Sequence, residues 1–298
     1  MTRQGDLSNS QKAATMDRMV SQNARNDGDG TGTPAELIVR DGTTLVYRVY
    51  GDRDDEPLLL VHGLGSNYSM WSPQITRYPD EGYFLIVPDI RGHGASDPVS
   101  TFEIDACADD LTAILDDIGV HETAIAGVSM GSLIAQVFAL RYPDRLTRLV
   151  LSDTFSRTHG LRARIAATGA TLGLSLMPSG LIIRLIESAH DDPEDEPLRE
   201  YYRTQLQEMD RDQLVQARKA INRFDRFGDL GQIEVPTLVV VGGNNPDWFI
   251  RLGEETAEQI PNATFDQLAH GSDPSNLTAT APFDRSLLSF LNIGCDTP

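Results

Sequence analysis

Five short, unbroken apolar runs, separated by stretches of helical periodicity, limit what this chain can fold into more than any other feature. The runs are residues 58–61, 84–87, 123–126, 149–151 and 237–241. Runs of this length, rich in branched side chains, are typical of strands that are buried on both faces of a parallel sheet. Strand alternating with helix therefore predicts an α/β fold with a doubly wound, mostly parallel sheet.

The rest of the chain is organised around these runs. Residues 104–118, 133–142 and 278–291 repeat apolar side chains at helical spacing, which predicts helices. Residues 37–50 alternate apolar and polar side chains around Asp41-Gly42, which predicts a hairpin with one solvated face. Residues 1–34 are polar and cannot bury enough apolar surface to offset their ordering entropy, so we expect a flexible tail.

The alternation of strand and helix stops between residues 155 and 233, where only helical patterns are found. These helices are either an ordinary insertion packed on the sheet or a cap over an active site. Position favours the cap, because ligands of open α/β sheets bind at the carboxyl ends of the strands. We therefore predict a core of residues 35–154 and 234–298 with a helical cap inserted at 155–233.

The chain is strongly acidic, with 44 Asp and Glu against 25 Lys and Arg and a formal net charge of −19. Such a surface repels phosphates and anionic membranes, so we expect neither nucleic acid nor membrane partners. Lysine is almost absent, at Lys12 and Lys219. This pattern fits either an ordinary acidic protein or, as we favour, a halophilic one whose carboxylates are screened by concentrated salt. Without a long apolar run or a leader, the expected location is cytoplasmic.

The pentapeptide Gly127-Val-Ser129-Met-Gly131 is the strongest chemical motif. It follows an apolar run and opens a helical stretch, which is the context of a nucleophile elbow. The turn is so sharp that its flanking positions must be small, and glycines stand there. We therefore predict that Ser129 is a nucleophile, which requires a base because a serine hydroxyl is otherwise weakly reactive.

Chain order selects the base, because acid and base follow the serine in this kind of site. Among the six histidines, His270 alone follows Ser129 outside the inserted helical region, in a loop before the last helix. Backbone N–H groups must also hold the oxyanion of a tetrahedral intermediate. We assign these to Met130, next to the nucleophile, and to Leu64 in the loop His62-Gly-Leu-Gly65.

These blocks, together with Met70-Trp71, Asp89-Ile-Arg-Gly-His-Gly-Ala-Ser96 and Ala269-His270-Gly271, resemble the α/β-hydrolase family. The resemblance is to its 3-oxoadipate enol-lactonase-like branch, and it is strong in the first half and weak across the cap. It implies hydrolysis of an ester, lactone or thioester, without a metal or an organic cofactor.

The resemblance also implies an acid after residues 237–241, in a Gly-x-x-Asp pattern, and here the sequence departs from the family. Asn245 holds the expected position in Gly242-Gly-Asn-Asn245-Pro-Asp247. Asp247 is our preferred acid and Asp153, after the run 149–151, is the alternative. If Asn245 itself stands in, the imidazole is oriented but its cation is not stabilised.

The predicted function is a serine hydrolase that acts through an acyl-enzyme on Ser129 on a small ester-like substrate. The alternatives are a carbon–carbon bond hydrolase or perhydrolase of the same fold, and a ligand-binding protein on a degenerate hydrolase scaffold. The altered acid loop motivates the last of these.

Overall fold

The computed structural model describes residues 32–157, 168–169, 171–173, 175–189 and 196–292. In this part of the chain one eight-stranded sheet has the order β1-β2-β4-β3-β5-β6-β7-β8. The β1–β2 and β2–β4 pairs are antiparallel, and the other pairs are parallel. The strands are β1 (Ala35–Ile38), β2 (Thr44–Tyr50), β3 (Glu56–Val61), β4 (Tyr83–Asp89), β5 (Thr123–Val128), β6 (Leu146–Ser152), β7 (Thr237–Val241) and β8 (Ala263–Gln267).

Each predicted strand is present, which confirms the doubly wound, mostly parallel fold. The helices are α2 (Ser72–Arg77), α3 (Ile104–Asp117), α4 (Met130–Arg141), α6 (Ser179–Ala189), α7 (Glu196–Glu208), α8 (Arg211–Arg223), α9 (Asp247–Gln259), α10 (Ser275–Thr278) and α11 (Thr280–Leu291). The predicted hairpin is β1 and β2.

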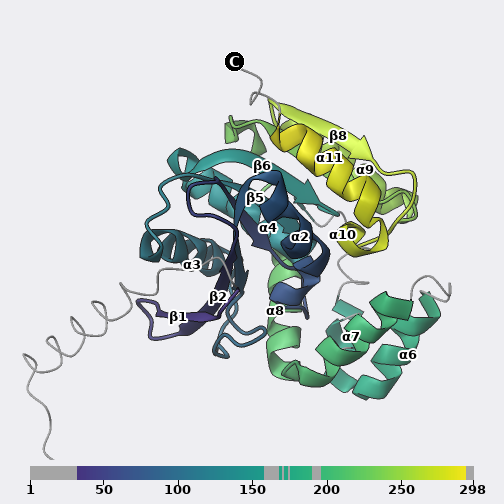
Figure 1. Ribbon diagram of the computed structural model, residues 1–298. Coiled ribbons are helices and arrows are strands. Elements are labelled where there is room, and N and C mark those ends of the chain that lie inside the picture. Colours follow the sequence, from purple (N-terminus) through teal and green to yellow (C-terminus); the bar gives the residue numbers. More distant parts are fainter. Residues whose placement is uncertain (1–31, 158–167, 170, 174, 190–195, 293–298) are drawn as a thin grey trace, which may run out of the picture.

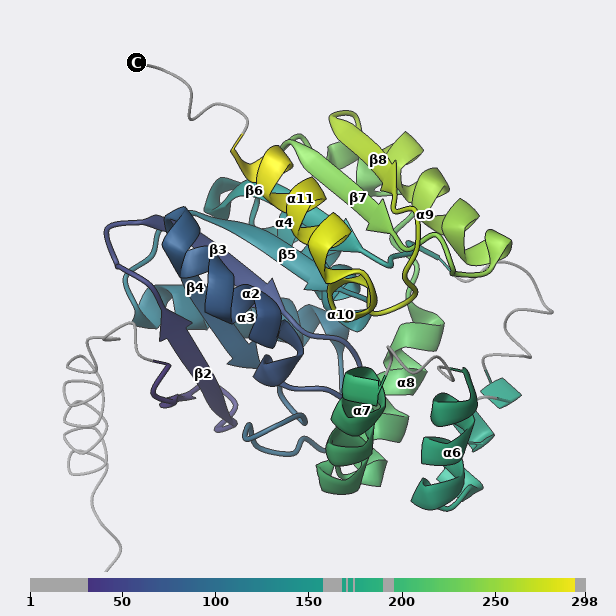
Figure 2. The same ribbon diagram turned by 45° about the vertical axis from the view of Figure 1, so that its right-hand side comes forward.

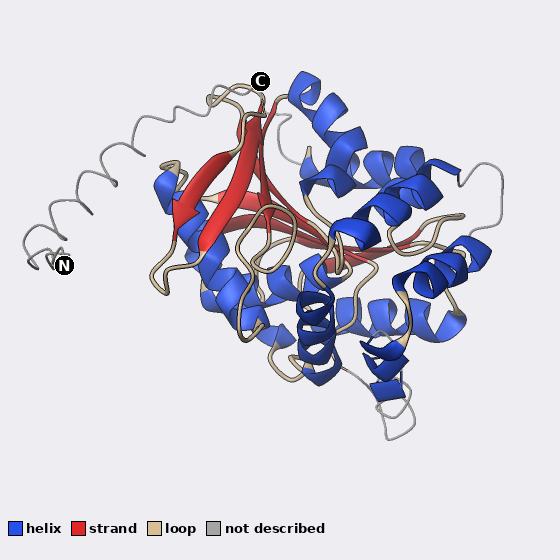
Figure 3. Cartoon of the chain, turned by 90° about the horizontal axis from the view of Figure 1, so that it is seen from below, coloured by secondary structure: helices blue, strands red, loops and turns tan. Residues whose placement is uncertain are grey.

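The helices cover both faces of the twisted sheet (Figure 3). Alternate strand residues point to opposite faces, so each strand feeds two cores. Leu59, Ile86 and Ile125 pack with α3 and α4, whereas Leu58 and Leu85 pack with the Trp71 region and α11. This two-sided burial explains why the sequence shows unbroken apolar runs rather than an alternating pattern.

Helices α6, α7 and α8 lie between β6 and β7 in the chain and gather below the sheet, past the arrowhead of β7 (Figures 1 and 2). They stand where the helical cap was expected. Residues 158–167 and 190–195, which contain His159 and His190, lie outside the described residues, as does most of the predicted tail.

Some elements were not predicted. A 3-10 helix (Tyr68–Trp71) and α2 connect β3 to β4, and α9 begins at Asp247. The last predicted helix, residues 278–291, is α11, and the short α10 before it was not predicted; helical geometry breaks between them at Ala279. Cys107 is a buried free thiol, and Cys295 lies outside the described residues. Among the described helices, none combines the length and apolar character needed to cross a bilayer.

Close packing of α4 against β3 fixes the start of α4. A Cβ on Gly131 would lie 2.1 Å from the carbonyl oxygen of Val61, which is backbone and cannot give way. We expect Gly131→Ala to lower the free energy of unfolding by at least about 1–3 kcal/mol. Thermal unfolding measures this, with Gly180→Ala in α6 as the control, because a Cβ there meets nothing within 4 Å. Equal melting temperatures for the two variants would contradict this account.

Candidate active site

Ser129 stands at the sharp turn between β5 and α4. Its backbone has φ 54° and ψ −117°, in the left-handed region that non-glycine residues rarely adopt. A Cβ on Gly127 would lie 2.3 Å from the carbonyl oxygen of Gly131, so both flanking glycines are sterically required. The amide of Ser129 donates to the carbonyl of Ser152 on β6 at 2.9 Å, which holds the turn against the sheet. This geometry is that of a nucleophile elbow.

The loop after β3 approaches the same turn. A Cβ on Gly63 would lie 3.4 Å from the Cβ of Ser129, so this loop passes directly beside Ser129. Met130 is the first residue of α4, and its N–H therefore has no acceptor within the helix. The loop and the helix start thus flank Ser129, as oxyanion donors must. The roles of Leu64 and Met130 as those donors stay predictions.

The hydroxyl of Ser129 meets a carboxylate. Ser129 Oγ donates to Asp273 Oδ2 at 2.9 Å. Asp273 lies in the loop between β8 and α10, which is the segment where a base was expected. The sequence predicted a histidine base in that segment, His270, and no acid was expected there.

His270 and Asp247, the predicted base and acid, lie elsewhere. His270 is exposed, and none of the hydrogen bonds among the described residues joins it to Ser129. Asp247 is exposed at the first turn of α9. The structure therefore brings neither of them to Ser129 through a hydrogen bond, and their catalytic roles stay predictions without geometric support.

The position of Asp273 follows from anchors on both sides of it. The amide of Ser272 donates to Thr278 Oγ1 at 2.9 Å, and the amide of Asp273 donates to Asn245 Oδ1 at 3.1 Å. The amide of Ser275 donates to Asp153 Oδ2 at 2.7 Å. His270 precedes these anchors, which explains why the loop presents residue 273, and not residue 270, to the serine.

Asp153, the alternative acid, is fully buried behind this loop. It follows β6 with φ 48° and accepts hydrogen bonds from Gly242 N at 3.2 Å and from Asn245 Nδ2 at 3.1 Å, besides those from Ser275. Burial raises the pKa of its carboxyl, and these hydrogen bonds oppose the shift. Asn245 therefore stands between two acids, since it donates to Asp153 and accepts from the backbone of Asp273.

The electrostatics of Asp273 are unusual. Burial and the nearby carboxylate of Asp153 raise its pKa to about 8, against the hydrogen bond from Ser129 and the charge of Arg218. Arg218 comes from α8, and burial lowers the pKa of its guanidinium. Tyr202 of α7 is also close, and burial followed by the charge of Asp273 raises its pKa. Arg218 and Tyr202 therefore both interact electrostatically with Asp273.

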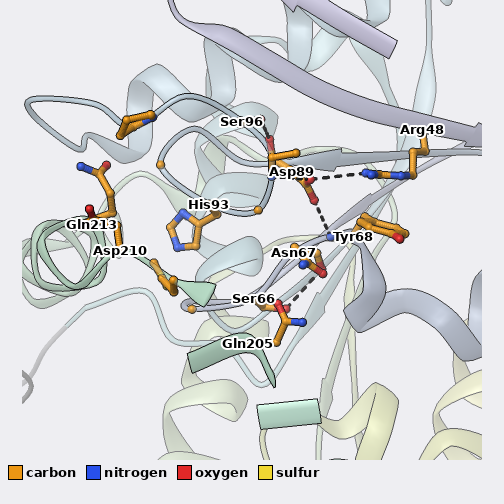
Figure 4. A pocket seen from close by; sticks show the side chains of 16 residues that line it. Arg48, Ser66, Asn67, Tyr68, Asp89, His93, Ser96, Gln205, Asp210 and Gln213 are labelled. Carbon is orange, nitrogen blue, oxygen red and sulfur yellow. Dashed lines mark hydrogen bonds and ion pairs between the residues drawn. The ribbon is translucent and has the colours of Figure 1, made fainter. Parts of the chain in front are cut away.

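A cavity of about 410 Å³ lies beside the loop after β3 (Figure 4). Gly65 and Ser66 line it on one side and Gln205 and Gln213 of the cap on another, whereas Ser129 and Asp273 do not. Asp89 sits at its edge, accepts from the amide of Tyr68 at 2.7 Å and pairs with Arg48 at 3.5 Å. These bonds tie the end of β4 to the 3-10 helix after β3 and to β2, which are structural contacts.

Comparison with known proteins agrees with this architecture. A model of the alpha/beta hydrolase fold family matches residues 56–165. The chain is 27% identical over 254 residues to 3-oxoadipate enol-lactonase 2 of Acinetobacter baylyi, covering 85% of this chain and 94% of that protein. It is also 27% identical over 283 residues to 2-hydroxy-6-oxononadienedioate/2-hydroxy-6-oxononatrienedioate hydrolase of Burkholderia vietnamiensis, covering 85% and 93%.

Among solved structures, the enol-lactonase from Burkholderia xenovorans LB400 superposes with a TM-score of 0.78 at 23% identity, covering 87% of this chain and all of that one. At this identity the likeness shows the fold. Together with the matches in sequence, it shows an α/β-hydrolase fold, and the chain resembles hydrolases of the 3-oxoadipate enol-lactonase branch.

Proposed function

We propose that this hydrolase cleaves a carboxylic ester, lactone or thioester through an acyl-enzyme on Ser129, with Asp273 as the proton acceptor in place of an imidazole. The observation that carries the proposal is the 2.9 Å hydrogen bond from Ser129 Oγ to Asp273 Oδ2, at a nucleophile elbow beside a glycine-rich loop. The ester-type hydrolases among its relatives support the bond type.

In the first half of the reaction, Ser129 Oγ attacks the carbonyl carbon while its proton passes to Asp273 Oδ2. The carbonyl π-bond becomes an oxyanion, which the amides of Leu64 and Met130 stabilise. When the oxyanion collapses, the bond to the leaving group breaks. Asp273 then gives its proton to the departing oxygen or sulfur, so that a neutral alcohol or thiol leaves and the acyl group stays on Ser129.

In the second half, Asp273 accepts a proton from water as the water oxygen attacks the acyl carbon. The second tetrahedral intermediate collapses, Ser129 Oγ recovers the proton, and the carboxylic acid is released. No step creates a cation on the base, because a protonated carboxyl is neutral. Asn245 at the family's acid position is consistent with this, since no imidazolium has to be stabilised.

A carboxyl can be an effective base only if its pKa is raised toward the working pH. The pKa of Asp273, about 8, satisfies this requirement, and it also means that Asp273 is largely protonated at neutral pH. The ionised, active form accumulates as the pH rises through 8. At pH 7 such an enzyme would show little activity, as a ligand-binding protein would. An activity assay therefore distinguishes an enzyme from a binding protein only at alkaline pH.

The experiment that tests the proposal is hydrolysis of p-nitrophenyl esters, from acetate to octanoate, at about pH 9 and in high and low salt. We expect turnover that falls by at least about a thousandfold in Ser129→Ala. Circular dichroism checks that the variant is folded. No serine-dependent turnover in either salt, from folded protein, would favour a binding protein instead.

Asp273→Asn separates catalysis from stability. It keeps an oxygen that accepts from Ser129 but removes the base, so we expect kcat to fall by at least about a hundredfold.

In the wild type we expect kcat/KM to rise with pH toward a plateau above about 8. A profile that instead rises near pH 6.5 would indicate a histidine base.

The same variant is expected to be more stable than the wild type near pH 8. The folded-state pKa of Asp273 is raised from 3.8 to about 8, so the folded state retains a proton that the unfolded chain loses. The stability that Asp273 gives the folded state is therefore fully present below about pH 4 and is lost as the pH rises toward 8. We expect Asp273→Asn to gain at least about 1 kcal/mol at pH 8 and nothing at pH 4, measured by denaturant unfolding.

Tyr201 of α7 links the cap to the oxyanion loop. Its hydroxyl is hydrogen-bonded to Ser66 Oγ, and it also lies in hydrogen-bond reach of Ser69 and the backbone of Asn67. Ser66 is two residues after Leu64. Tyr201 therefore holds the loop whose backbone is proposed to bind the oxyanion.

We expect Tyr201→Phe to lower kcat by about tenfold with a smaller change in KM, because a displaced oxyanion donor weakens binding of the transition state most. Steady-state kinetics measures the split. The control is Tyr142→Phe, which removes a hydrogen bond to Asp109 at the far end of α4. An equal effect of the two variants on kcat would remove the argument for Tyr201 as a positioning residue.

A further inference from the structure

The carbonyl oxygen of Ser129 accepts two hydrogen bonds from one residue. The first comes from the backbone amide of Ser132 at 3.0 Å, as in the tight first turn of many helices. The second is shorter, at 2.6 Å, and comes from the hydroxyl of the same residue, Ser132 Oγ. Ser132 is completely buried, on the third residue of α4. Its hydroxyl therefore adds a bond to a carbonyl that already has a backbone partner.

Ser132 Oγ is held in place by further buried polar groups. It lies 2.7 Å from Thr154 Oγ1, in the segment after β6. Gln136, one turn further along α4, donates from Nε2 to Thr154 Oγ1 at 2.9 Å and to the carbonyl oxygen of Phe155 at 3.0 Å. Thr154 and Gln136 are completely buried, like Ser132. These three side chains form one buried polar cluster.

The proton of Ser132 belongs to the bond with Ser129. A hydroxyl has one proton, and a backbone carbonyl oxygen can only accept. If the proton pointed elsewhere, two oxygen atoms without a proton between them would lie 2.6 Å apart, which is repulsive. The contact with Thr154 therefore fixes the position of Ser132 Oγ from the other side, and the hydroxyl points at the carbonyl of Ser129.

This carbonyl shares its peptide group with the N–H of Met130. Because the amide is stabilised by resonance, a hydrogen bond to its oxygen draws electron density from its nitrogen and makes the N–H a stronger donor. The N–H of Met130 stands at the first position of α4, where it has no acceptor within the helix. The hydroxyl of Ser132 thus acts on the N–H group that the proposed function assigns to the oxyanion.

Stability alone does not account for the position of this hydroxyl. Buried polar partners can often be replaced by apolar groups of the same shape with little change in the free energy of unfolding. An alanine at position 132 would still satisfy the carbonyl of Ser129 through its backbone amide. The additional bond therefore falls on a peptide group beside the reacting hydroxyl without being needed to complete the helix.

We propose that Ser132 is a positioning residue of the reaction: its hydroxyl, held by Thr154, fixes the plane of the Ser129–Met130 peptide group and strengthens its N–H as an oxyanion donor. This inference rests on the proposed function and adds a residue to its machinery. The effect is greatest in the transition state, because full negative charge develops on the substrate oxygen only there. No bond to Ser132 forms or breaks during the reaction.

Steady-state kinetics of Ser132→Ala at about pH 9 tests the role in the reaction, with the p-nitrophenyl ester that the wild type hydrolyses fastest. The variant weakens an oxyanion donor but does not remove it. We therefore expect kcat to fall by about tenfold and KM to change by less than about twofold. Thr154→Val, which removes the contact that holds Ser132 Oγ but keeps the side-chain shape, is expected to lower kcat in the same direction.

The matched control is Ser156→Ala, which removes another buried hydroxyl. Ser156 Oγ donates to Gln136 Oε1 at 2.9 Å and does not contact Ser132. We expect this variant to lose stability to a similar degree in thermal unfolding and to keep kcat within about twofold of the wild type. An equal loss of kcat in Ser132→Ala and Ser156→Ala would overturn the positioning role, since loosening of the core would then explain both.

A spectroscopic measurement needs no turnover. Protein labelled with ¹³C at serine carbonyls and ¹⁵N at methionine gives two carbonyl–amide correlations in NMR, because Ser-Met pairs stand at 69–70 and 129–130. A hydrogen bond to a peptide oxygen deshields both the carbonyl carbon and the attached nitrogen. We therefore expect Ser132→Ala to move the signals of Ser129 and Met130 upfield and to leave the other pair in place.

The second Ser-Met pair supplies an internal control. Ser72 Oγ donates to the carbonyl oxygen of Ser69 at 2.7 Å, with the same spacing of three residues. Ser72→Ala should move the signals of Ser69 and Met70 upfield and leave those of the elbow unchanged. If Ser72→Ala shifts its own pair but Ser132→Ala does not, the proposal is wrong.

The two measurements separate this inference from the proposed function. If the wild type hydrolyses no ester, the proposed function fails, and upfield shifts in Ser132→Ala would still support a strengthened N–H at Met130. If the wild type is active and the signals shift, but kcat of Ser132→Ala stays within about twofold of the wild type, the positioning role is overturned while the proposed function stands.

Discussion

The carboxylate of Asp153 is the interaction on which the site depends. It is buried at the end of β6 and accepts hydrogen bonds from Gly242 after β7 and from Ser275 after β8. One side chain thus ties together the chain beyond three neighbouring strands. Because Ser275 is two residues from Asp273, this tie also sets where Asp273 meets Ser129. The sequence predicted Asp153 as the alternative catalytic acid. In the structure its hydrogen bonds hold together the segments that follow β6, β7 and β8.

The fold was predictable because burial on both sheet faces leaves unbroken apolar runs, and because an elbow requires glycines at fixed positions. Gly127 and Gly131 carry that requirement in the sequence itself. The partner of Ser129 was not predictable in the same way. Choosing His270 relied on residue type and chain order, whereas the loop's path depends on hydrogen bonds that its backbone amides donate to Asn245 and Thr278, which no local pattern reveals. The sequence does place an acid, Asp273, shortly after the last strand. Its position next to Ser129 depends on the hydrogen bonds that anchor the loop, and these are visible only in the structure.

Two departures from the family pattern are chemically related. An imidazole base becomes a cation and benefits from a carboxylate behind it. A carboxyl base becomes neutral, and a second ionised carboxylate in contact with it would be repulsive. Asn245, at the acid position, lies between Asp273 and Asp153. It donates a hydrogen bond to Asp153 and accepts one from the backbone amide of Asp273, and it adds no charge. Considered alone, Asn245 suggests a catalytic triad that has lost its acid. Together with Asp273 it is the residue type that a serine–carboxyl site favours.

Ser129 and Asp153 are the two described non-glycine residues with positive φ, and they end the adjacent strands β5 and β6. Their unfavourable backbone geometry is maintained by the parallel pairing of central strands, which no cap residue contributes to. The geometry at Ser129 is therefore fixed by the central sheet. The helices between β6 and β7 supply Tyr201, and substitutions in these helices leave the pairing of β5 with β6 unchanged. In such an arrangement, lineages can exchange one substrate for another through the cap while the bond-breaking machinery stays unchanged.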